Sequence, residues 1–304
     1  MPARRPADPL PGIVPTLAEL VALRRVAQSR RPAQPGRHGA SGQAPSPQRG
    51  RGMEYAESRE YARGDDARHV DWRLTARSGR MHTKLFQAER ERLTLVVADT
   101  APALYFGTRV RFKSVQAARA GAVAAWAAVG EGDRVAALRG SSTQPAVRPA
   151  GGTRGALRVL DALARWYARP PDDDAGLADA LARARRLLKP GSRLVVLAEA
   201  GSLDGVGDAT WAALSLHHDA TVVLVDDPLE RAPPPQRLPM LAGGQRLDPD
   251  LGDPAQRRRW DEAFSNAAGQ AVARLRARGI RVGLLSTDAP SQSWLLPVSG
   301  GGRP

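Results

Sequence analysis

Apolar residues along this chain fall into short continuous runs that alternate with longer stretches of helical periodicity. The run Leu93–Ala98 ends in Asp99 and has the pattern of a central strand buried on both faces. Comparable runs predict further strands at Arg134–Leu138, Leu194–Ala198, Ala220–Val225 and Arg281–Leu285. The stretches around them predict helices at Thr16–Gln28, Lys113–Val129, Thr153–Tyr167, Gly176–Leu188, Gly207–Leu216 and Pro254–Arg278.

Strands that alternate with helices predict an α/β fold with a doubly wound, mostly parallel sheet and helices on both faces. The proline-rich segment Pro233–Asp250 interrupts the alternation and has room for a short edge hairpin. We expect the proline-rich residues 1–15 to be disordered. Ser29–Gly52 holds Arg, Pro, Gly and Ser with almost no large apolar residue, which indicates an irregular basic loop.

The chain has 304 residues, 42% of them hydrophobic and 25% charged, with a net charge of +14. Such a charge suggests nucleic acid as a partner. However, nearly all the basic residues are arginine, and alanine, glycine and proline are abundant, which indicates a GC-rich genome instead. The basic stretches also lack the interleaved aromatic residues that stack on bases, so nucleic-acid binding is disfavoured.

The sequence contains no cysteine, which excludes disulfides and thiolate metal sites and fits a reducing cytoplasm. No apolar run approaches the roughly 18 to 20 residues that a membrane span needs. The first residues are charged but have no apolar core behind them, so they do not form a signal peptide. We therefore expect a soluble, cytoplasmic protein.

The run Arg59–Arg77 concentrates five arginines and four carboxylates around one glycine, Gly64, which can take a positive φ without steric cost. We expect the carboxylates to bond nearby backbone and to accept from arginine forks, while Trp72 covers the cluster. The prediction is a fixed polar junction between two parts of the protein. Its residues are Arg59, Tyr61, Arg63, Gly64, Asp65, Asp66, Arg68, Asp71, Trp72, Arg73 and Arg77.

These residues also carry a family resemblance. Gly50–Gly52, Glu54–Tyr55, Arg59–Arg77, Lys84–Gln87 and Asp226–Glu230 together resemble the ordered signature of the DUF58 family. The resemblance implies a von Willebrand factor A-like domain preceded by the signature segment, in proteins associated with MoxR-type AAA+ ATPases. It also places this chain with the short, soluble members. The expected organisation is a disordered N-terminus at 1–15, a signature segment at 16–92, the von Willebrand A-like domain at 93–290 and a tail at 291–304.

The same resemblance identifies a degenerate metal site. In von Willebrand A-like domains the position of Asp99 opens an Asp-x-Ser-x-Ser motif that holds Mg²⁺ through carboxylate and hydroxyl oxygens. Here Ala101 and Ala103 stand at the serine positions, and Glu199 stands where an aspartate is expected. Ala175 and Gly176 stand where a threonine is expected, so three hydroxyls are missing in total and we expect no bound metal and no cofactor. Asp99 is then expected to accept hydrogen bonds from the loop that follows it.

We therefore expect a protein without catalytic residues, an adaptor or assembly factor that acts with a MoxR-type AAA+ ATPase on an unknown client. Two alternatives remain open. One is a metal-dependent hydrolase built on Asp65, Asp66, His69 and Asp71, since carboxylates beside a histidine can bind a metal or move protons. The other is a basic nucleic-acid-binding protein, whose affinity would fall steeply with salt.

Overall fold

The computed structural model describes residues 12–29, 53–88, 92–242 and 245–295, which divide into two compact units. The larger unit holds the helices before residue 30 together with the described chain from Arg92 onward, and the smaller unit lies within Pro32–Glu91. Residues 16–92, which the sequence grouped as one segment, are therefore divided between the two units.

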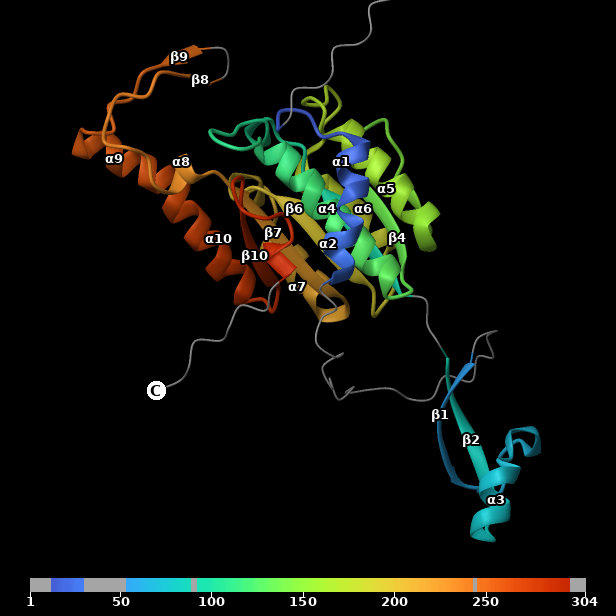
Figure 1. The fold of residues 1–304 in the computed structure, drawn as a ribbon. Helices are drawn as coiled ribbons and strands as arrows, with labels where there is room; N and C mark the ends of the chain where they lie inside the picture. The colour runs from blue at the N-terminus through green and yellow to red at the C-terminus, as the bar shows by residue number, and fades with distance from the viewer. Residues whose placement is uncertain (1–11, 30–52, 89–91, 243–244, 296–304) are drawn as a thin grey trace, which may run out of the picture. The chain divides into compact units, whose positions relative to one another are not determined.

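A six-stranded sheet forms the centre of the larger unit (Figure 1). Its strand order is β10-β7-β6-β3-β4-β5, with every neighbouring pair parallel except β4 and β5. The bounds are β3 Leu93–Ala98, β4 Arg134–Arg139, β5 Val147–Ala150, β6 Arg193–Ala198, β7 Asp219–Asp226 and β10 Arg281–Ser286. The α/β class and the mostly parallel sheet are thus confirmed, and the antiparallel edge strand β5 is an addition to the prediction.

Side chains of the strands alternate between two cores, because successive Cβ atoms of a strand point to opposite faces. On β3, Val96 and Ala98 belong to one core, and Leu95 and Val97 to the other. The first core is covered by α1 Leu17–Ala22, α2 Arg24–Ser29, α4 Lys113–Gly130 and α5 Gly152–Trp166. The second is covered by α6 Gly176–Leu187, α7 Asp208–His217 and α10 Ala267–Arg276.

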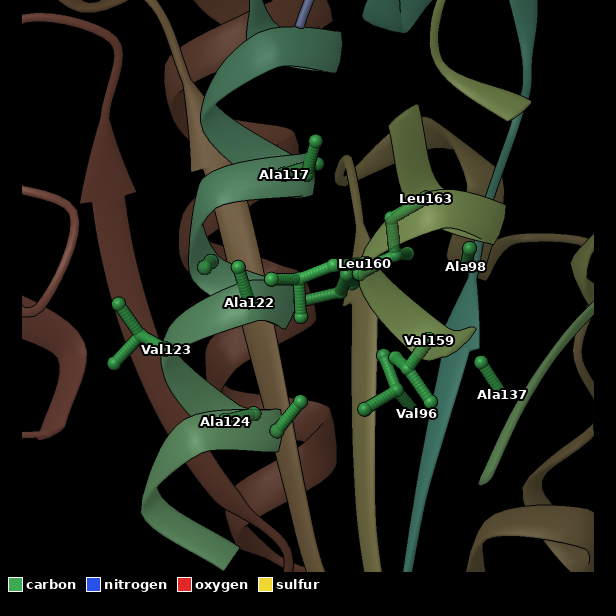
Figure 2. Packing of buried hydrophobic residues seen from close by; sticks show 14 of the residues in the cluster. Val96, Ala98, Ala117, Ala122, Val123, Ala124, Ala137, Val159, Leu160 and Leu163 are labelled. Atoms are coloured by element: carbon green, nitrogen blue, oxygen red, sulfur yellow. The ribbon is translucent and has the colours of Figure 1, made fainter. Parts of the chain in front are cut away.

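Helix α4 is buried around most of its circumference, as its apolar pattern predicts. Small side chains such as Ala117 and Ala122 allow it to lie close to its neighbours, and Figure 2 shows Leu160 and Leu163 of α5 in the same cluster. Each fully buried leucine of this kind contributes about 1.5–3 kcal/mol relative to an exposed one. The packing of α4 holds its first turn at the edge of the sheet where the strands end.

The predicted helix at Thr16–Gln28 begins as expected, with the Thr16 side chain accepting a hydrogen bond from the Glu19 amide (3.2 Å). It divides at Leu23 into α1 and α2. The sequence predicts Leu17, Leu20, Val21 and Leu23 on one apolar face, but only Leu20 and Leu23 are buried in the first core, whereas Leu17 and Val21 are exposed.

Between β7 and β10 the chain forms α8 Pro228–Arg231, a separate hairpin of β8 Met240–Ala242 and β9 Gln245–Leu247, and α9 Pro254–Asp261. A hairpin is thus present in this segment as expected, but it forms a sheet of its own and is not an edge of the central sheet. The predicted long helix is divided by a π-helical turn, Glu262–Asn266, which joins α9 to α10. Short 3-10 turns follow β3, β6 and β10, at Pro102–Leu104, Gly201–Leu203 and Ser293–Leu295.

The smaller unit is an antiparallel hairpin with one short helix. Strands β1 Met53–Glu60 and β2 His82–Ala88 pair with each other, and the chain between them forms a 3-10 turn, Ala67–His69, and α3 Trp72–Ser78. Val70 is buried and bridges to Thr83 on β2. The run Arg59–Arg77 thus lies on β1, on α3 and in the connection between them. Of the other signature segments, Lys84–Gln87 lie on β2, Asp226–Glu230 lie in the larger unit at the end of β7 and in α8, and Gly50–Gly52 lie outside the described residues.

Candidate functional site

Ligands of open α/β sheets bind at the carboxyl ends of the strands, above all where the strand order reverses. In this sheet the order reverses between the neighbours β3 and β6. Asp99 and Glu199 each follow directly after one of these strands. The structure therefore brings both carboxylates that the sequence predicted to the same edge and the same pair of strands.

Asp99 is almost fully buried, with 1% of its surface exposed. One carboxylate oxygen, Oδ1, accepts a hydrogen bond from the Ala101 amide (3.0 Å), which confirms the predicted bond to the following loop. The other, Oδ2, has no hydrogen-bond partner in the described part of the chain. Burial raises the pKa of Asp99 to about 6, with a smaller contribution from the charge of Glu199. The Ser202 hydroxyl offsets part of this rise, although its geometry falls short of a hydrogen bond.

This burial predicts a pH-dependent contribution of Asp99 to stability. Because its folded pKa lies above its ordinary value of 3.8, the ionised carboxylate destabilises the folded state, and the penalty grows as pH rises from about 4 to about 6. A rise of that size corresponds to roughly 3 kcal/mol. Asp99→Asn should therefore gain about this much stability relative to the wild type between about pH 4 and pH 7, measured by urea denaturation.

Asp161→Asn is the matched control, since Asp161 is half exposed and pairs with Arg165 on the same helix. It should not reproduce the gain of roughly 3 kcal/mol, because an exposed carboxylate keeps its contact with water. If the Asp99→Asn curve runs parallel to the wild-type curve, the carboxylate titrates in the folded state at its ordinary pKa and the burial argument fails.

The strand-end residues do not fit a hard divalent cation. Ala101 caps the start of the 3-10 turn after β3, and Ala103 lies within that turn. Neither side chain has an oxygen that could bind a metal. The Glu199 carboxylate lies 3.5 Å from the Lys113 ammonium, which competes for its oxygen. Within the described ranges, no three His, Asp or Glu side chains gather as metal ligands would. Mg²⁺ needs a near-octahedral set of oxygens, so this donor set is too small to hold it.

Lys113, the first residue of α4, is a buried cation at this edge, and the sequence analysis did not predict its role. Its side chain is 2% exposed, and its Nζ lies 2.6 Å from Glu230 Oε1 as well as 3.5 Å from Glu199 Oε2. Burial raises the pKa of Glu230, and the charge of Lys113 opposes that rise. A buried ammonium is thus shared by two carboxylates next to Asp99's strand.

Glu230 is fixed in place by the start of α8. Its Oε2 accepts from the Asp227 amide (2.9 Å), while Asp227 Oδ1 accepts from the Leu229 amide (3.0 Å), which together form a capping box. Asp227 also accepts from Thr108 and Thr287. The spacing of Asp227 and Glu230 is a capping-box signal in the sequence, and it could have revealed this support.

In the smaller unit, Asp65 organises the turn that follows β1. Its Oδ1 lies 2.7 Å from Arg59 Nη2, its Oδ2 accepts from the Ala62 amide (2.8 Å), and its carbonyl accepts from the Tyr61 hydroxyl (2.8 Å). Gly64 has a φ of 110°, so the prediction of a positive φ there is confirmed. The predicted pairing of arginine and carboxylate is present for Arg59 and Asp65.

The other signature carboxylates cap helical turns. Asp66 Oδ1 accepts from the Arg68 amide at the start of the 3-10 turn, and Asp71 Oδ1 accepts from the Leu74 amide at the start of α3. Asp71 Oδ2 also accepts from the Ser58 hydroxyl (2.9 Å). Carboxylates that already accept from backbone are poorly placed to bind a metal or to exchange protons, so nothing in this geometry favours the hydrolase alternative.

Trp72 does not cover this cluster, contrary to the prediction. As the first residue of α3 it is 68% exposed to solvent. Arg63, Arg73 and Arg77 are also exposed, and their side chains have no ion-pair partner within the described residues. Arg68 is exposed too, with its Nε 3.4 Å from Asp66. We define Trp72, Arg73 and Arg77 as the α3 surface.

The fold and the strand-end edge define an α/β protein of the doubly wound class. Comparison with known families then assigns the chain more closely: the family described as "Protein of unknown function DUF58" matches residues 57–268. The protein belongs to the DUF58 family.

Its relatives include an uncharacterized protein of Mycobacterium bovis and two of Mycobacterium tuberculosis. Each is 30% identical over 260 residues, which covers 82% of this chain and 78% of the relative. Among solved structures, an aerotolerance-related membrane protein from Bacteroides fragilis aligns with a TM-score of 0.41 and 12% identity, over 67% of this chain and 95% of that chain. In this chain, none of the helices among the described residues is long and apolar enough to cross a membrane.

Proposed function

We propose that this protein is a non-catalytic adaptor or assembly factor that acts in the cytoplasm with a MoxR-type AAA+ ATPase, through a von Willebrand A-like domain. Counted in chain order, the sheet strands run 3-2-1-4-5-6 across the sheet, with the third strand antiparallel at the edge. This is a doubly wound order and supports the finer fold assignment. The ATPase partnership derives from the family resemblance.

The observation that carries the interaction role is the exposed α3 surface. Trp72 is 68% exposed on a helix that also presents Arg73 and Arg77, four residues apart and therefore on one side. Large exposed aromatic residues beside arginines are enriched among the residues that contribute most to protein–protein binding. A tryptophan kept in water at this position serves no packing role within the smaller unit.

The charge of this surface selects an acidic partner. Arg73 and Arg77 have no neutralising carboxylate within the described residues, and Arg63 lies exposed on the turn before α3. Arginine forks bind carboxylates bidentately. Electrostatic attraction of this kind raises the association rate most and weakens with salt. Any conformational work would come from ATP hydrolysis by the partner.

The test is a binding measurement between this protein and a MoxR-type ATPase of the same organism, in the ATP-bound and ADP-bound states, at low and moderate salt. We expect the two nucleotide states to differ in affinity. Trp72→Ala should weaken binding at least about tenfold, because a central aromatic residue of an interface contributes on the order of 2 kcal/mol or more.

Leu216→Ala is the matched control, since Leu216 is a large apolar residue that is 75% exposed on the other unit. Its affinity should equal that of the wild type. Absence of binding in every condition, with both proteins folded, would exclude the adaptor function. Equal losses for both variants would show that the α3 surface is not the contact.

A second candidate is single-stranded nucleic acid, because the exposed Trp72 supplies the aromatic residue that the basic stretches were expected to lack. Stacking on an aromatic residue contributes about 1–3 kcal/mol per base. Oligonucleotide binding by the wild type that falls steeply with salt and is lost in Trp72→Ala would favour this function over the adaptor.

A further inference from the structure

A cavity of about 370 Å³ opens at the carboxyl end of β4, apart from the Lys113 cluster. It lies between the β4–β5 connection and the segment that follows α5. The residues that matter for its chemistry are Arg139, Gln144, Arg165, Trp166, Arg169 and Asp173. Arg139 is the last residue of β4, so a strand of the sheet places this arginine directly in the cavity wall.

Arg139 is a buried cation with a donor left over. Its side chain is 2% exposed; Nη2 lies 2.5 Å from Asp173 Oδ1, and Nη1 donates to the Gly140 carbonyl (3.0 Å). Its Nε is buried and has no hydrogen-bond partner in the described part of the chain. Because buried polar groups are almost always paired, this unsatisfied guanidinium N–H, in a residue of the cavity wall, is a donor available to an acceptor.

The loop that carries this cavity is held rigidly. Asp173 Oδ2 accepts from the hydroxyls of Ser141 and Thr143, both at 2.5 Å. On the opposite side, Arg183 donates to the carbonyls of Arg139, Ser141 and Gln144. A site whose walls are fixed by a second layer of hydrogen bonds loses little entropy when it binds a ligand.

The charges around the cavity favour a monoanion. Three guanidinium groups face two carboxylates, those of Asp172 and Asp173. Hydrogen bonds from Ser141, Thr143 and Arg139 hold the pKa of Asp173 well below its ordinary value, so it stays ionised and neutralises one arginine. Arg165 also pairs with Asp161 outside the cavity, but that pair is exposed and weak. Arg169 is exposed at the mouth and has no ion-pair partner among the described residues.

We propose that this cavity binds a carboxylate group, held by the Arg139 Nε–H and the Arg169 guanidinium. The planar arginine fork matches a carboxylate, and a single excess positive charge suits this monoanion better than a phosphate dianion. The volume lies near the lower end for ligand sites, which fits a short organic acid or one acidic side chain. The carboxylate could belong to a small organic acid or to an acidic side chain of a protein partner. Only the second of these rests on the proposed adaptor function.

The experiment is a titration of the whole protein with acetate, succinate, inorganic phosphate and a short glutamate-rich peptide at constant ionic strength. The readout is the Arg139 Nε–H resonance in ¹⁵N-correlated NMR spectra. We expect a saturable shift with succinate. Arg169→Gln should weaken it about tenfold or more, since hydrogen bonds to charged groups are strong. Arg169 is exposed, so this variant should fold even if changes at Arg139 prevent folding.

Arg148→Gln is the control, an exposed arginine on β5 outside the cavity, and it should bind succinate as the wild type does. No saturable shift with any carboxylate would overturn the proposal, as would tighter binding of phosphate than of succinate. Tighter binding of the peptide than of succinate would identify a partner's side chain as the ligand, and equal binding would identify a small acid. Carboxylate binding without any ATPase binding would reject the adaptor function and leave this site standing.

Discussion

Replacing Lys113 by methionine should lower the free energy of unfolding by about 3–5 kcal/mol at about pH 8, because it removes one partner of a buried ion cluster. Methionine has a similar length and fills the same space. It leaves the Glu230 carboxylate, 2.6 Å from the ammonium in the wild type, without its counter-charge. Glu199 loses the same cation at 3.5 Å. Urea denaturation of the two proteins measures the difference.

The deficit should shrink as the pH is lowered from about 8 to about 5. Burial already raises the pKa of Glu230, and Lys113 opposes that rise, so the pKa should climb further in the variant. A carboxyl with a folded pKa above its unfolded value destabilises the protein when ionised, and the penalty disappears once the group is protonated. Stability of Lys113→Met is therefore regained toward acid.

Two further variants sharpen this test. The double variant Lys113→Met with Glu230→Gln should recover part of the lost free energy of unfolding at about pH 8. The glutamine amide is neutral, so no buried charge is left without a counter-charge. Lys189→Met, which changes an exposed lysine, should match the wild type within about 0.5 kcal/mol. A deficit in Lys113→Met below about 1 kcal/mol, or one that does not change with pH, would show that the cluster is effectively solvated.

The parallel strands could be predicted because they are buried on both faces, which demands a continuous apolar run. Strand β3 has the predicted bounds, Leu93–Ala98, and β4 differs by one residue. Strand β5, Val147–Ala150, is a short edge strand that contains Arg148 and a proline, so it lacks such a run. Edge strands bury less apolar surface than central strands, so their sequences carry a weaker hydrophobic pattern from which to predict them.

The division of the predicted helix Pro254–Arg278 had no local signal. A π-helical turn at Glu262–Asn266 changes the face that the second half presents, so that Trp260 donates to the Glu230 carbonyl while Leu275 enters the core. Such turns arise from tertiary packing rather than from propensity. The periodicity before and after the turn looks like that of one helix.

The candidate site was predictable only in part, for a similar reason. Asp99 and Glu199 could be placed because each directly follows an apolar strand run. The partners of Lys113 and Arg139 stand 117 and 34 residues away, so no spacing along the chain reveals them. The prediction that Trp72 covers the charged cluster was wrong. A tryptophan among arginines and carboxylates is compatible with either a covered or an exposed position, so the sequence does not distinguish the two.

Gly140→Ala should lower the free energy of unfolding by about 3 kcal/mol or more, since no side chain fits between β4 and α6. A Cβ at this position would lie 2.1 Å from the Gly176 carbonyl oxygen and 2.9 Å from its carbonyl carbon. These are backbone atoms at the start of α6, and they cannot rotate away as a side chain could. The strand end or the helix must move instead.

The matched control is the same substitution where space is open. Gly269 lies within α10, and a Cβ there would meet nothing within 4 Å. Gly269→Ala should therefore stabilise the protein by about 0.5–1 kcal/mol, because alanine loses less backbone entropy in a helix. The measurement is urea denaturation of both variants. If Gly140→Ala also keeps wild-type stability, β4 and α6 do not approach each other this closely in solution. The rigid wall inferred for the Arg139 cavity then loses its support.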